Sequence, residues 1–408
     1  MDVAAPSRAP DAYAGPRIAL LGVLALMMLV PVTLPVTVLR SLVQERFAVS
    51  EFLTSLFMSV NMLGAVLAAP LAGAIADRTG RRAPLVTGAL ALHALLLLAL
   101  AAPLPFGVFM TVRFLEGAAH IAALSTLLGV AGRARAESQR GRVMGLVGGG
   151  ITLGVALGAP LGGVIGRHDP LIPLYVGSAL VAVAALVSWW GLEEPRGGEE
   201  RPSAAEISSA LRANPLLLAP LAFAFVDRFT VGFYTTTFSL FLSRIHGFSP
   251  PRIGLSIALL MLPFGLLSYP FGRLAERWSR VAMITIGSLV YAFGTAAVAW
   301  CRPDVLPVLM VTLGVASAVM FIPSLLITSD AAPERIRTTA MGAFNAAGSL
   351  GFILGPATGG FVSQWVASRA GWEAGYRAAF GVAGLSVLVC VALALPFLMR
   401  LVRAGRTT

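Results

Sequence analysis

Residues 137–163 read ESQRGRVMGLVGGGITLGVALGAPLGG, and residues 334–360 read ERIRTTAMGAFNAAGSLGFILGPATGG. The two stretches share an acid, an Arg, a Met and a series of Gly, and the members of each pair lie 197 residues apart. The shared positions begin with Glu137 and Glu334 and end with Gly163 and Gly360. A constant separation of almost half the chain indicates two copies of one unit, arranged in parallel.

A second pair of stretches repeats in the same order. Residues 73–82 read GAIADRTGRR and residues 272–280 read GRLAERWSR, with the shared Gly, acid and two Arg 199 residues apart. Parallel repeats are common in membrane transporters, where the substrate site lies between the repeats near the middle of the bilayer. The repeats therefore predict two similar halves with a binding site between them.

The composition is that of a membrane protein. The 408 residues are 57% hydrophobic and 12% charged, with a mean hydropathy of +0.84, whereas soluble domains contain about 25% charged residues. The two Cys and four His have no spacing typical of metal ligands, and the net charge of +11 arises from short Arg clusters between apolar stretches. We therefore expect a lipid bilayer around the chain, and no nucleic-acid partner, metal site or cofactor.

Apolar stretches long enough to cross a bilayer, about 20 residues each, recur along the chain. They cover residues 18–39, 52–75, 83–102, 105–131, 143–166, 171–192, 215–242, 252–271, 281–301, 304–329, 339–366 and 376–399. The first is longer than the apolar core of a signal peptide, about 7–15 residues, so it is interpreted as a span. The pattern predicts an all-α integral membrane fold of twelve transmembrane helices in two pseudo-symmetric halves of six.

The hydrophilic stretch 193–213 divides the chain into these halves. We expect an N-terminal tail at 1–17, a first half at 18–192, a cytoplasmic linker at 193–213, a second half at 214–400 and a C-terminal tail at 401–408. Of the 30 basic residues, 20 fall on the side of the predicted bilayer that holds both termini, and eight on the other. Because Arg-rich loops stay in the cytoplasm, both termini are predicted to be cytoplasmic, in the inner membrane of a bacterium.

The stretch at 73–82 resembles the loop signature between spans 2 and 3 of the major facilitator superfamily. The residues that carry the resemblance are Gly73, Asp77, Arg78, Gly80, Arg81 and Arg82, with a weaker copy at Gly272, Glu276, Arg277 and Arg280. A Gly at position 80 permits a tight turn, and Asp77 can pair with Arg in neighbouring loops. The resemblance implies a transporter that works by alternating access, with these residues as a cytoplasmic latch. The alternative is that the Arg residues only fix the topology.

A Gly-rich pattern occupies spans 5 and 11. Small residues four positions apart let membrane helices approach closely, so both copies are predicted to pack helices. Span 11 resembles the antiporter motif GxxxGPxxGG of the same family, which usually lies in span 5 and implies export. The residues are Gly351, Gly355, Pro356 and Gly359 in span 11, and Gly154, Gly158, Pro160 and Gly162 in span 5, where the Pro is moved by one position.

Two spans contain charged residues, at a cost of about 2.5–3.5 kcal/mol each at mid-membrane. In span 4, Arg113, Glu116 and His120 share one helical face. The family pattern RxxxGxxxG is matched at Arg113 and Gly117 but has Ile121 in place of its second Gly, which weakens the proton-relay role that the pattern implies.

In span 7, Asp227 and Arg228 are followed by Tyr234 on the face of Asp227. The charged residues of spans 4 and 7 either form a salt bridge that holds the halves together or line a wet cavity that binds substrate or protons. They have no counterparts in the opposite half, which favours the second interpretation. Asn61 in span 2 either faces this cavity or bonds to a neighbouring helix.

These features predict a secondary transporter, not an enzyme, that moves a small organic solute by alternating access and exports it in exchange for protons. Glu116 or Asp227 would carry the proton, and the chain would act as a monomer. One alternative is an importer or uniporter of a small anionic metabolite, which Arg113 and Arg228 would bind. Another is a non-transporting sensor or assembly factor built on a transporter scaffold.

Overall fold

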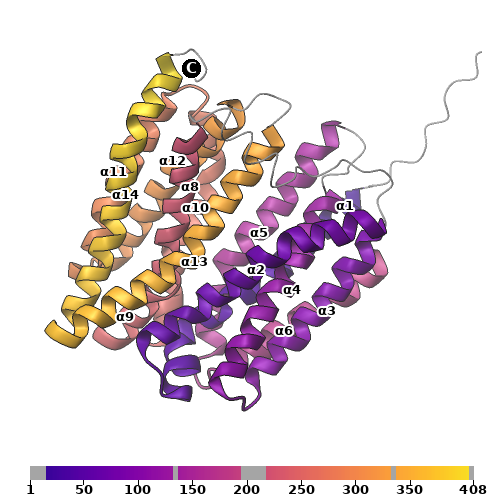
Figure 1. The fold of residues 1–408 in the computed structure, drawn as a ribbon, viewed down its shortest axis with the longest axis horizontal. Helices are drawn as coiled ribbons and strands as arrows, with labels where there is room; N and C mark the ends of the chain where they lie inside the picture. Colours follow the sequence, from indigo (N-terminus) through magenta and orange to yellow (C-terminus); the bar gives the residue numbers. More distant parts are fainter. Residues whose placement is uncertain (1–14, 132–136, 194–216, 332–336, 404–408) are drawn as a thin grey trace, which may run out of the picture.

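The computed structural model describes residues 15–131, 137–193, 217–331 and 337–403, and every regular element within these ranges is a helix (Figure 1). The N-terminal tail, most of the linker and the last residues of the C-terminal tail lie outside them. The helices of the first half are α1 (Gly15–Thr33), α2 (Glu51–Thr79), α3 (Arg82–Ala101), α4 (Phe106–Ala131), α5 (Glu137–Ile165) and α6 (Ile172–Gly191).

The second half repeats this order, with its first span divided in two. Its helices are α8 (Leu218–Thr235), α9 (Thr237–Ile245), α10 (Pro250–Leu274), α11 (Arg280–Ala297), α12 (Leu306–Ala331), α13 (Arg337–Ala370) and α14 (Trp372–Arg403). Ten helices in the described ranges are long and apolar enough to cross a membrane. The more polar α8–α9 pair and α13 coincide with the predicted spans 7 and 11. The predicted all-helical membrane fold is confirmed.

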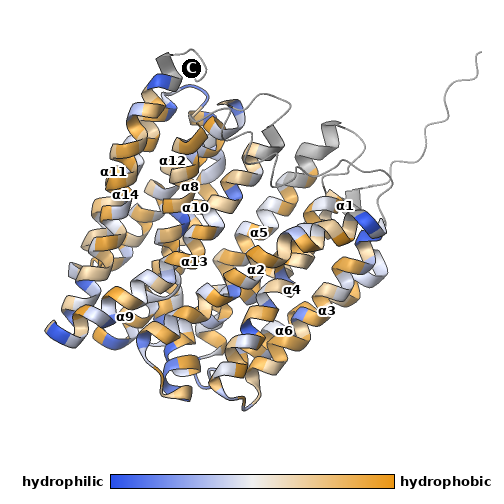
Figure 2. Ribbon diagram, viewed as in Figure 1, coloured by the Kyte–Doolittle hydropathy of each residue, from blue (hydrophilic) through white to orange (hydrophobic). Residues whose placement is uncertain are grey.

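The outer surface of the bundle is apolar, as a lipid-facing surface requires. Large side chains such as Trp189, Trp190 and Leu95 are 71%, 85% and 64% exposed. Figure 2 shows hydrophobic residues along the length of the helices and hydrophilic ones gathered mainly toward their ends.

The first span of each half is interrupted at a corresponding depth. Helix α1 contains Pro31 and ends at Thr33, and the chain continues as the 3₁₀ helix η1 (Leu34–Val38) and the π-helix η2 (Arg40–Glu45). Pro lacks the N–H that a continuing helix needs. In the second half, α8 ends at Thr235, and Thr236 has φ −130° and ψ −75°. Both interrupted segments therefore present irregular backbone at the same level of the molecule.

Within each half the helices pack in the same pairs. Helix α1 lies against α5 as α8 lies against α13, and α2 against α4 as α10 against α12. In the Gly series of α5, a Cβ at Gly158 or Gly162 would overlap the carbonyl oxygens of Val30 or Leu34 in the first span. The series therefore sets how closely the two spans approach.

The copy of this series in α13 meets α8 in the same way. A Cβ at Gly351 or Gly355 would overlap the carbonyl oxygens of Phe225 or Phe229, and one at Gly359 would overlap the Thr237 hydroxyl. The two prolines of the motif contact glycines, since a Cβ at Gly254 would lie 2.8 Å from Cα of Pro160 and one at Gly232 would meet Pro356.

The two halves meet through α2 with α13 and α5 with α10. Polar contacts between them gather at the end that carries the turns at 46–50, 246–249 and 371, here called the closed end. Ser59 donates to the carbonyl of Ile353 at 2.6 Å, and Ser239 to that of Val36 at 2.7 Å. In Figure 1 the two bundles come together around the start of α2 and α9 and diverge toward the end that holds the C-terminus.

Candidate substrate and proton site

A cavity of about 240 Å³ lies between the halves. It is lined by α1, α2, α4 and α5 of the first half and by α8, α10 and α13 of the second. Most of the lining is apolar and includes Met58, Met62, Met261, Phe264 and Phe352. Its polar lining groups are Thr33, His120, Thr152, Arg228, Tyr234 and Thr235.

Asp227 and Arg228 are neighbours on α8 but lie in different surroundings. Asp227 is 1% exposed, and Ser317 of α12 donates a hydrogen bond of 3.2 Å to its Oδ1. Its Oδ2 lies 3.7 Å from Nε of Arg228 and, within the described part of the chain, accepts no hydrogen bond. One oxygen of this buried carboxylate therefore has a nearby charge but no donor among these residues.

Arg228 reaches the cavity, with its side chain 33% exposed. Its guanidinium lies 5.0 Å from the ring centre of Phe321 and 5.6 Å from that of Phe352. Gly348 of α13 makes room for the side chain, because a Cβ there would lie 3.0 Å from Cγ of Arg228. The cation therefore lies close to two aromatic rings at the cavity wall.

Two tyrosines support this wall. The hydroxyls of Tyr234 and Thr295 lie 2.9 Å apart, and Thr230 lies 3.1 Å from the hydroxyl of Tyr291. Both pairs join α8 to α11. Tyr234 also lines the cavity, whereas Thr230 and Tyr291 are fully buried.

The first half contains a separate polar cluster around Glu116. Arg113 and Asn61 donate to its Oε2 at 2.7 and 2.5 Å, and Nε2 of His93 lies 2.7 Å from its Oε1. All four side chains are at most 2% exposed. Gly117 permits this arrangement, since a Cβ there would overlap the carbonyl oxygen of Asn61.

Arg113 makes further contacts through Nε and Nη2. Its Nε donates to the carbonyl of Phe57 at 3.3 Å, its Nη2 lies 3.5 Å from the Met58 sulfur, and the guanidinium lies 4.1 Å from the Phe57 ring centre. Beside this cluster, His120 lines the cavity, with its ring 5.3 Å from that of His93.

The residues selected from the sequence thus fall into two groups. Arg113, Glu116, His120 and Asn61 share one cluster in the first half, and Asp227, Arg228 and Tyr234 lie together on α8. Asn61 bonds to Glu116 behind the cavity wall. Arg228 lines the cavity and Arg113 does not. The two Arg therefore cannot bind one anionic solute together in this conformation. The sequence does not predict His93 as a member of the cluster, because a single His in an apolar span has no distinguishing pattern.

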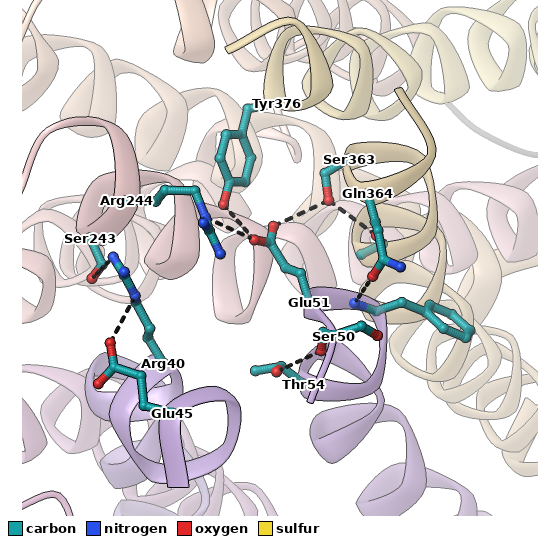
Figure 3. A network of polar contacts seen from close by, with 12 residues as sticks. Arg40, Glu45, Ser50, Glu51, Thr54, Ser243, Arg244, Ser363, Gln364 and Tyr376 are labelled. Carbon is teal, nitrogen blue, oxygen red and sulfur yellow. Dashed lines mark hydrogen bonds and ion pairs between the residues drawn. The ribbon is translucent and has the colours of Figure 1, made fainter. Parts of the chain in front are cut away.

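A third group of polar residues lies at the closed end and is not predicted by the sequence patterns (Figure 3). Glu51, at the start of α2, accepts a hydrogen bond of 2.8 Å from Tyr376 and one of 3.3 Å from Ser363, and lies 3.3 Å from Nε of Arg244. Gln364 accepts from the N–H of Phe52 at 2.9 Å. These contacts tie α2 of the first half to α9, α13 and α14 of the second.

Two further residues belong to this end of the molecule. Arg40 pairs with Glu45 at 3.1 Å and with Ser243 of the other half at 3.5 Å. His246 packs against Phe241 with ring centres 4.9 Å apart. Partial burial lowers the pKa of His246, which the charge of Glu373 opposes, so its neutral form is favoured.

The loop motif lies at the opposite end. Gly80 has φ +64° and donates to the carbonyl of Ala76, which ends α2, so the predicted tight turn is confirmed. Arg78 and Arg81 are exposed, Arg82 begins α3, and the side chain of Asp77 lies outside the described part. Gly73 is within α2.

In the second copy, Gly272 lies near the end of α10, and Glu276 and Arg277 are exposed. Arg280 pairs with Asp330, with 2.5 Å between Nη1 and Oδ2. This bond joins the start of α11 to the end of α12. The sequence does not predict this role for Asp330, because Asp330 lies outside the repeated motif.

With the duplicated halves, the cavity between them and the loop motif established, comparison with known families is decisive. A family model for the Major Facilitator Superfamily matches residues 18–243 and 221–407. The chain belongs to the Major Facilitator Superfamily. As a member, it is a multi-pass membrane transporter of a small molecule and not an enzyme.

Relatives and solved structures agree on the superfamily fold. Multidrug resistance protein 2 of Bacillus subtilis (strain 168) is 25% identical over 221 residues, 52% of this chain and 52% of that protein. A bacterial homologue of the human lysosomal transporter Spinster, in an inward-facing and unoccupied conformation, superposes with a TM-score of 0.82, 15% identity, and 95% and 99% of the two chains covered. The nucleoside transporter NupG gives a TM-score of 0.76 at 16% identity, with 93% and 98% covered.

Proposed function

We propose that this transporter couples movement of a small organic solute to movement of protons, with Asp227 as the proton-carrying group. The supporting observation is the position of its carboxylate. Asp227 is buried, with one oxygen lacking a donor in the described ranges, and it adjoins Arg228, which lines the cavity. A buried carboxylate costs free energy unless it is paired and hydrogen-bonded. Any change in the position or pairing of Arg228 therefore changes the stability of the charged form of Asp227.

Glu116 is the less suitable proton carrier. Arg113 and Asn61 donate to it and His93 lies against it, so its negative charge is fully compensated. Protonation would leave the Arg113 charge buried without its partner, which is costly. We therefore assign Glu116 a structural role in the first half.

Alternating access requires that the contacts of the closed end separate when the other end closes. If the Arg distribution gives the correct orientation, the closed end faces outward and the cavity opens toward the cytoplasm. The TM-score of 0.82 with an inward-facing transporter supports this conformation.

The solute charge decides the coupling mode. A cation would compete with the proton for Asp227, which gives antiport, the mode predicted from span 11. Export by antiport is supported by the multidrug resistance relative. An anion would instead bind Arg228 and leave Asp227 free for a proton, so both would move together. The exposure of Arg228 to the cavity favours this second mode.

The test uses proteoliposomes that contain a pH-sensitive dye. Lipophilic cations, sugars and organic anions are added one at a time to wild type, Asp227→Asn, Glu116→Gln and Asp304→Asn. Asp304 is a matched control because its side chain is 61% exposed and pairs with the exposed Arg302. We expect solute-dependent proton flux in wild type and in Asp304→Asn, and none in Asp227→Asn.

The folded fraction of Glu116→Gln should retain coupled flux. Solute flux without any proton movement in wild type would refute proton coupling. Coupled flux that survives in Asp227→Asn and disappears in folded Glu116→Gln would transfer the proton site to the first half.

A further inference from the structure

We propose that the substrate is an amphipathic carboxylate, a small molecule with an apolar body whose carboxylate group binds Arg228. The proposal deepens the proposed function, on which only its proton step rests. It is carried by the unfilled donors of Arg228, by the restraint on its guanidinium and by the character of the rest of the cavity.

Arg228 has donors without acceptors in the described part of the chain. A guanidinium is always charged and carries five N–H groups. The acid paired with it there is Asp227, whose Oδ2 is 3.7 Å from Nε, which is too long for a hydrogen bond. Among the described residues its two terminal nitrogens donate to none. A charged fork with free donors at a cavity wall is suited to a carboxylate, which accepts two parallel hydrogen bonds from it.

Arg113 shows what a structural Arg in this molecule looks like. It is 0% exposed, pairs with Glu116 at 2.7 Å and also donates to the Phe57 carbonyl. Arg228 differs in exposure and in hydrogen bonding, since its side chain is 33% exposed and has no hydrogen bond in the described ranges. A purely structural role would not require this exposure.

The guanidinium of Arg228 is restrained before any ligand arrives. The Phe321 and Phe352 rings lie 5.0 and 5.6 Å from it, and Gly348 lets α13 pass close to the side-chain stem. Aromatic faces attract the cation and exclude water from it. Less side-chain entropy is then lost on binding, and the ionic hydrogen bonds form in a partly dry site.

The rest of the cavity suits the apolar part of such a molecule. Its described lining holds no Asp or Glu, and Met, Leu, Val, Ile and Phe side chains predominate. A cation would therefore meet the repulsion of Arg228 without a compensating charge on this lining. The volume of about 240 Å³ is slightly below the range of about 300–1,000 Å³ typical of ligand pockets, so the molecule is small.

Carboxylate binding would also draw in a proton. A carboxylate at Arg228 withdraws the neighbouring cation from Asp227, whose other described neighbours include the neutral hydroxyls of Ser317 and Tyr291. Asp227 then gains stability by protonation. Because such coupling is reciprocal, one anion and one proton bind together, and their joint movement transfers no net charge.

The test measures binding to the full chain in nanodiscs by isothermal titration. The probes are hexanoate, octanoate, decanoate and benzoate, with the matched amides and alkyltrimethylammonium ions as neutral and cationic counterparts. The variants are Arg228→Gln, Arg228→Lys and the control Arg302→Gln, whose side chain is 81% exposed. Size-exclusion profiles establish that each variant is folded.

We expect wild type and Arg302→Gln to bind at least one carboxylate, and the matched amide about tenfold or more weakly. Arg228→Gln should lose this preference, and Arg228→Lys should keep part of it. Equal carboxylate affinity in folded Arg228→Gln, tighter binding of the cations, or no binding of any carboxylate would overturn the proposal.

Proton uptake, measured in the same titrations with a pH dye, separates this proposal from the proposed function. Carboxylate binding that needs Arg228 but takes up no proton supports the anion site and refutes proton coupling. Proton flux that needs Asp227 and is driven by neutral solutes, with no effect of Arg228→Gln on their binding, supports coupling and refutes the anion site.

Discussion

Each half of this transporter places an acid and an Arg close together within its helices, but the two pairs lie in opposite surroundings. In the first half, Arg113 and Glu116 bond to each other and to surrounding groups, behind the cavity wall. In the second, Asp227 and Arg228 are 3.7 Å apart, each with hydrogen-bonding capacity that the described residues leave unfilled, and Arg228 faces the cavity. A satisfied cluster stabilises one arrangement, whereas an unsatisfied pair can respond to a ligand.

The same contrast separates repeated from unrepeated features. The Gly series of α5 and α13 performs one task twice, holding α1 and α8 at backbone contact. The charged pairs lie on α4 and α8, which are not equivalent helices of the two halves. Duplicated positions therefore build the scaffold, and the two charge clusters make the halves different.

The largest expected effect comes from breaking the satisfied cluster. Arg113→Ala leaves Glu116 charged, fully buried and without its main partner, which should cost about 3–5 kcal/mol of stability. Thermal unfolding in detergent, followed by fluorescence-detected size exclusion, measures it. The double variant Arg113→Leu/Glu116→Leu should recover much of this loss. If Arg113→Ala were as stable as wild type, the cluster around Glu116 would tolerate loss of a charged partner as well as the Asp227–Arg228 pair does.

A smaller effect, equal in the two halves, is expected at the repeated glycines. Gly158→Ala would meet the Val30 carbonyl and Gly355→Ala the Phe229 carbonyl, and such overpacking costs about 1–3 kcal/mol. The control is Gly145→Ala in α5, where a Cβ would have nothing within 4 Å. Unequal losses at Gly158 and Gly355, measured by the same unfolding assay, would contradict the scaffold symmetry.

The repeated glycines can be predicted well from the sequence, whereas the charged cluster around Glu116 cannot. The constant spacing of Gly154 and Gly351 predicts helix packing because close approach depends on residue size, which a sequence displays directly. Which buried charges are satisfied depends on distant partners. Asn61 reaches Glu116 across 55 residues, and His93 meets the same acid from a third helix.

Other features escape prediction for related reasons. Glu51 adjoins a predicted span and looks like an ordinary loop acid, yet its partner Tyr376 is 325 residues away. The division between α8 and α9 falls at Thr236, where no Pro or Gly marks it. The interruption after α1 is easier to predict from sequence, because Pro31 and Pro35 lie beside it.

A third effect is expected at the closed end. It concerns the equilibrium between conformations and not the stability of the fold. Glu51→Gln removes an ionic contact with Arg244 and weakens the bonds from Tyr376 and Ser363. Hydrogen bonds to charged groups contribute about 1.5–3 kcal/mol, so the closed end should separate more often. The matched control is Glu373→Gln, whose side chain is 66% exposed and pairs with Arg377 of its own helix.

Spin labels report this separation. Arg167→Cys and Asp304→Cys place one label on each half at the closed end, in a background without Cys301 and Cys390. Electron–electron distance distributions should show a longer component in Glu51→Gln and not in Glu373→Gln. Identical distributions in both would mean that the Glu51 network does not hold this end closed.

The smallest effect on stability, and the sharpest test of the comparison, is expected at Asp227. Asp227→Asn keeps the shape of the side chain and can still accept from Ser317, and Arg228 remains partly exposed. The change should therefore alter the unfolding free energy by about 1 kcal/mol or less, while it abolishes proton-coupled flux. If Asp227→Asn instead destabilised the protein as much as Arg113→Ala, the second pair would be a structural salt bridge like the first. The two charged pairs would then differ in geometry but not in role. The proton-coupling site would have to lie elsewhere along the cavity, where His120 is the next titratable candidate.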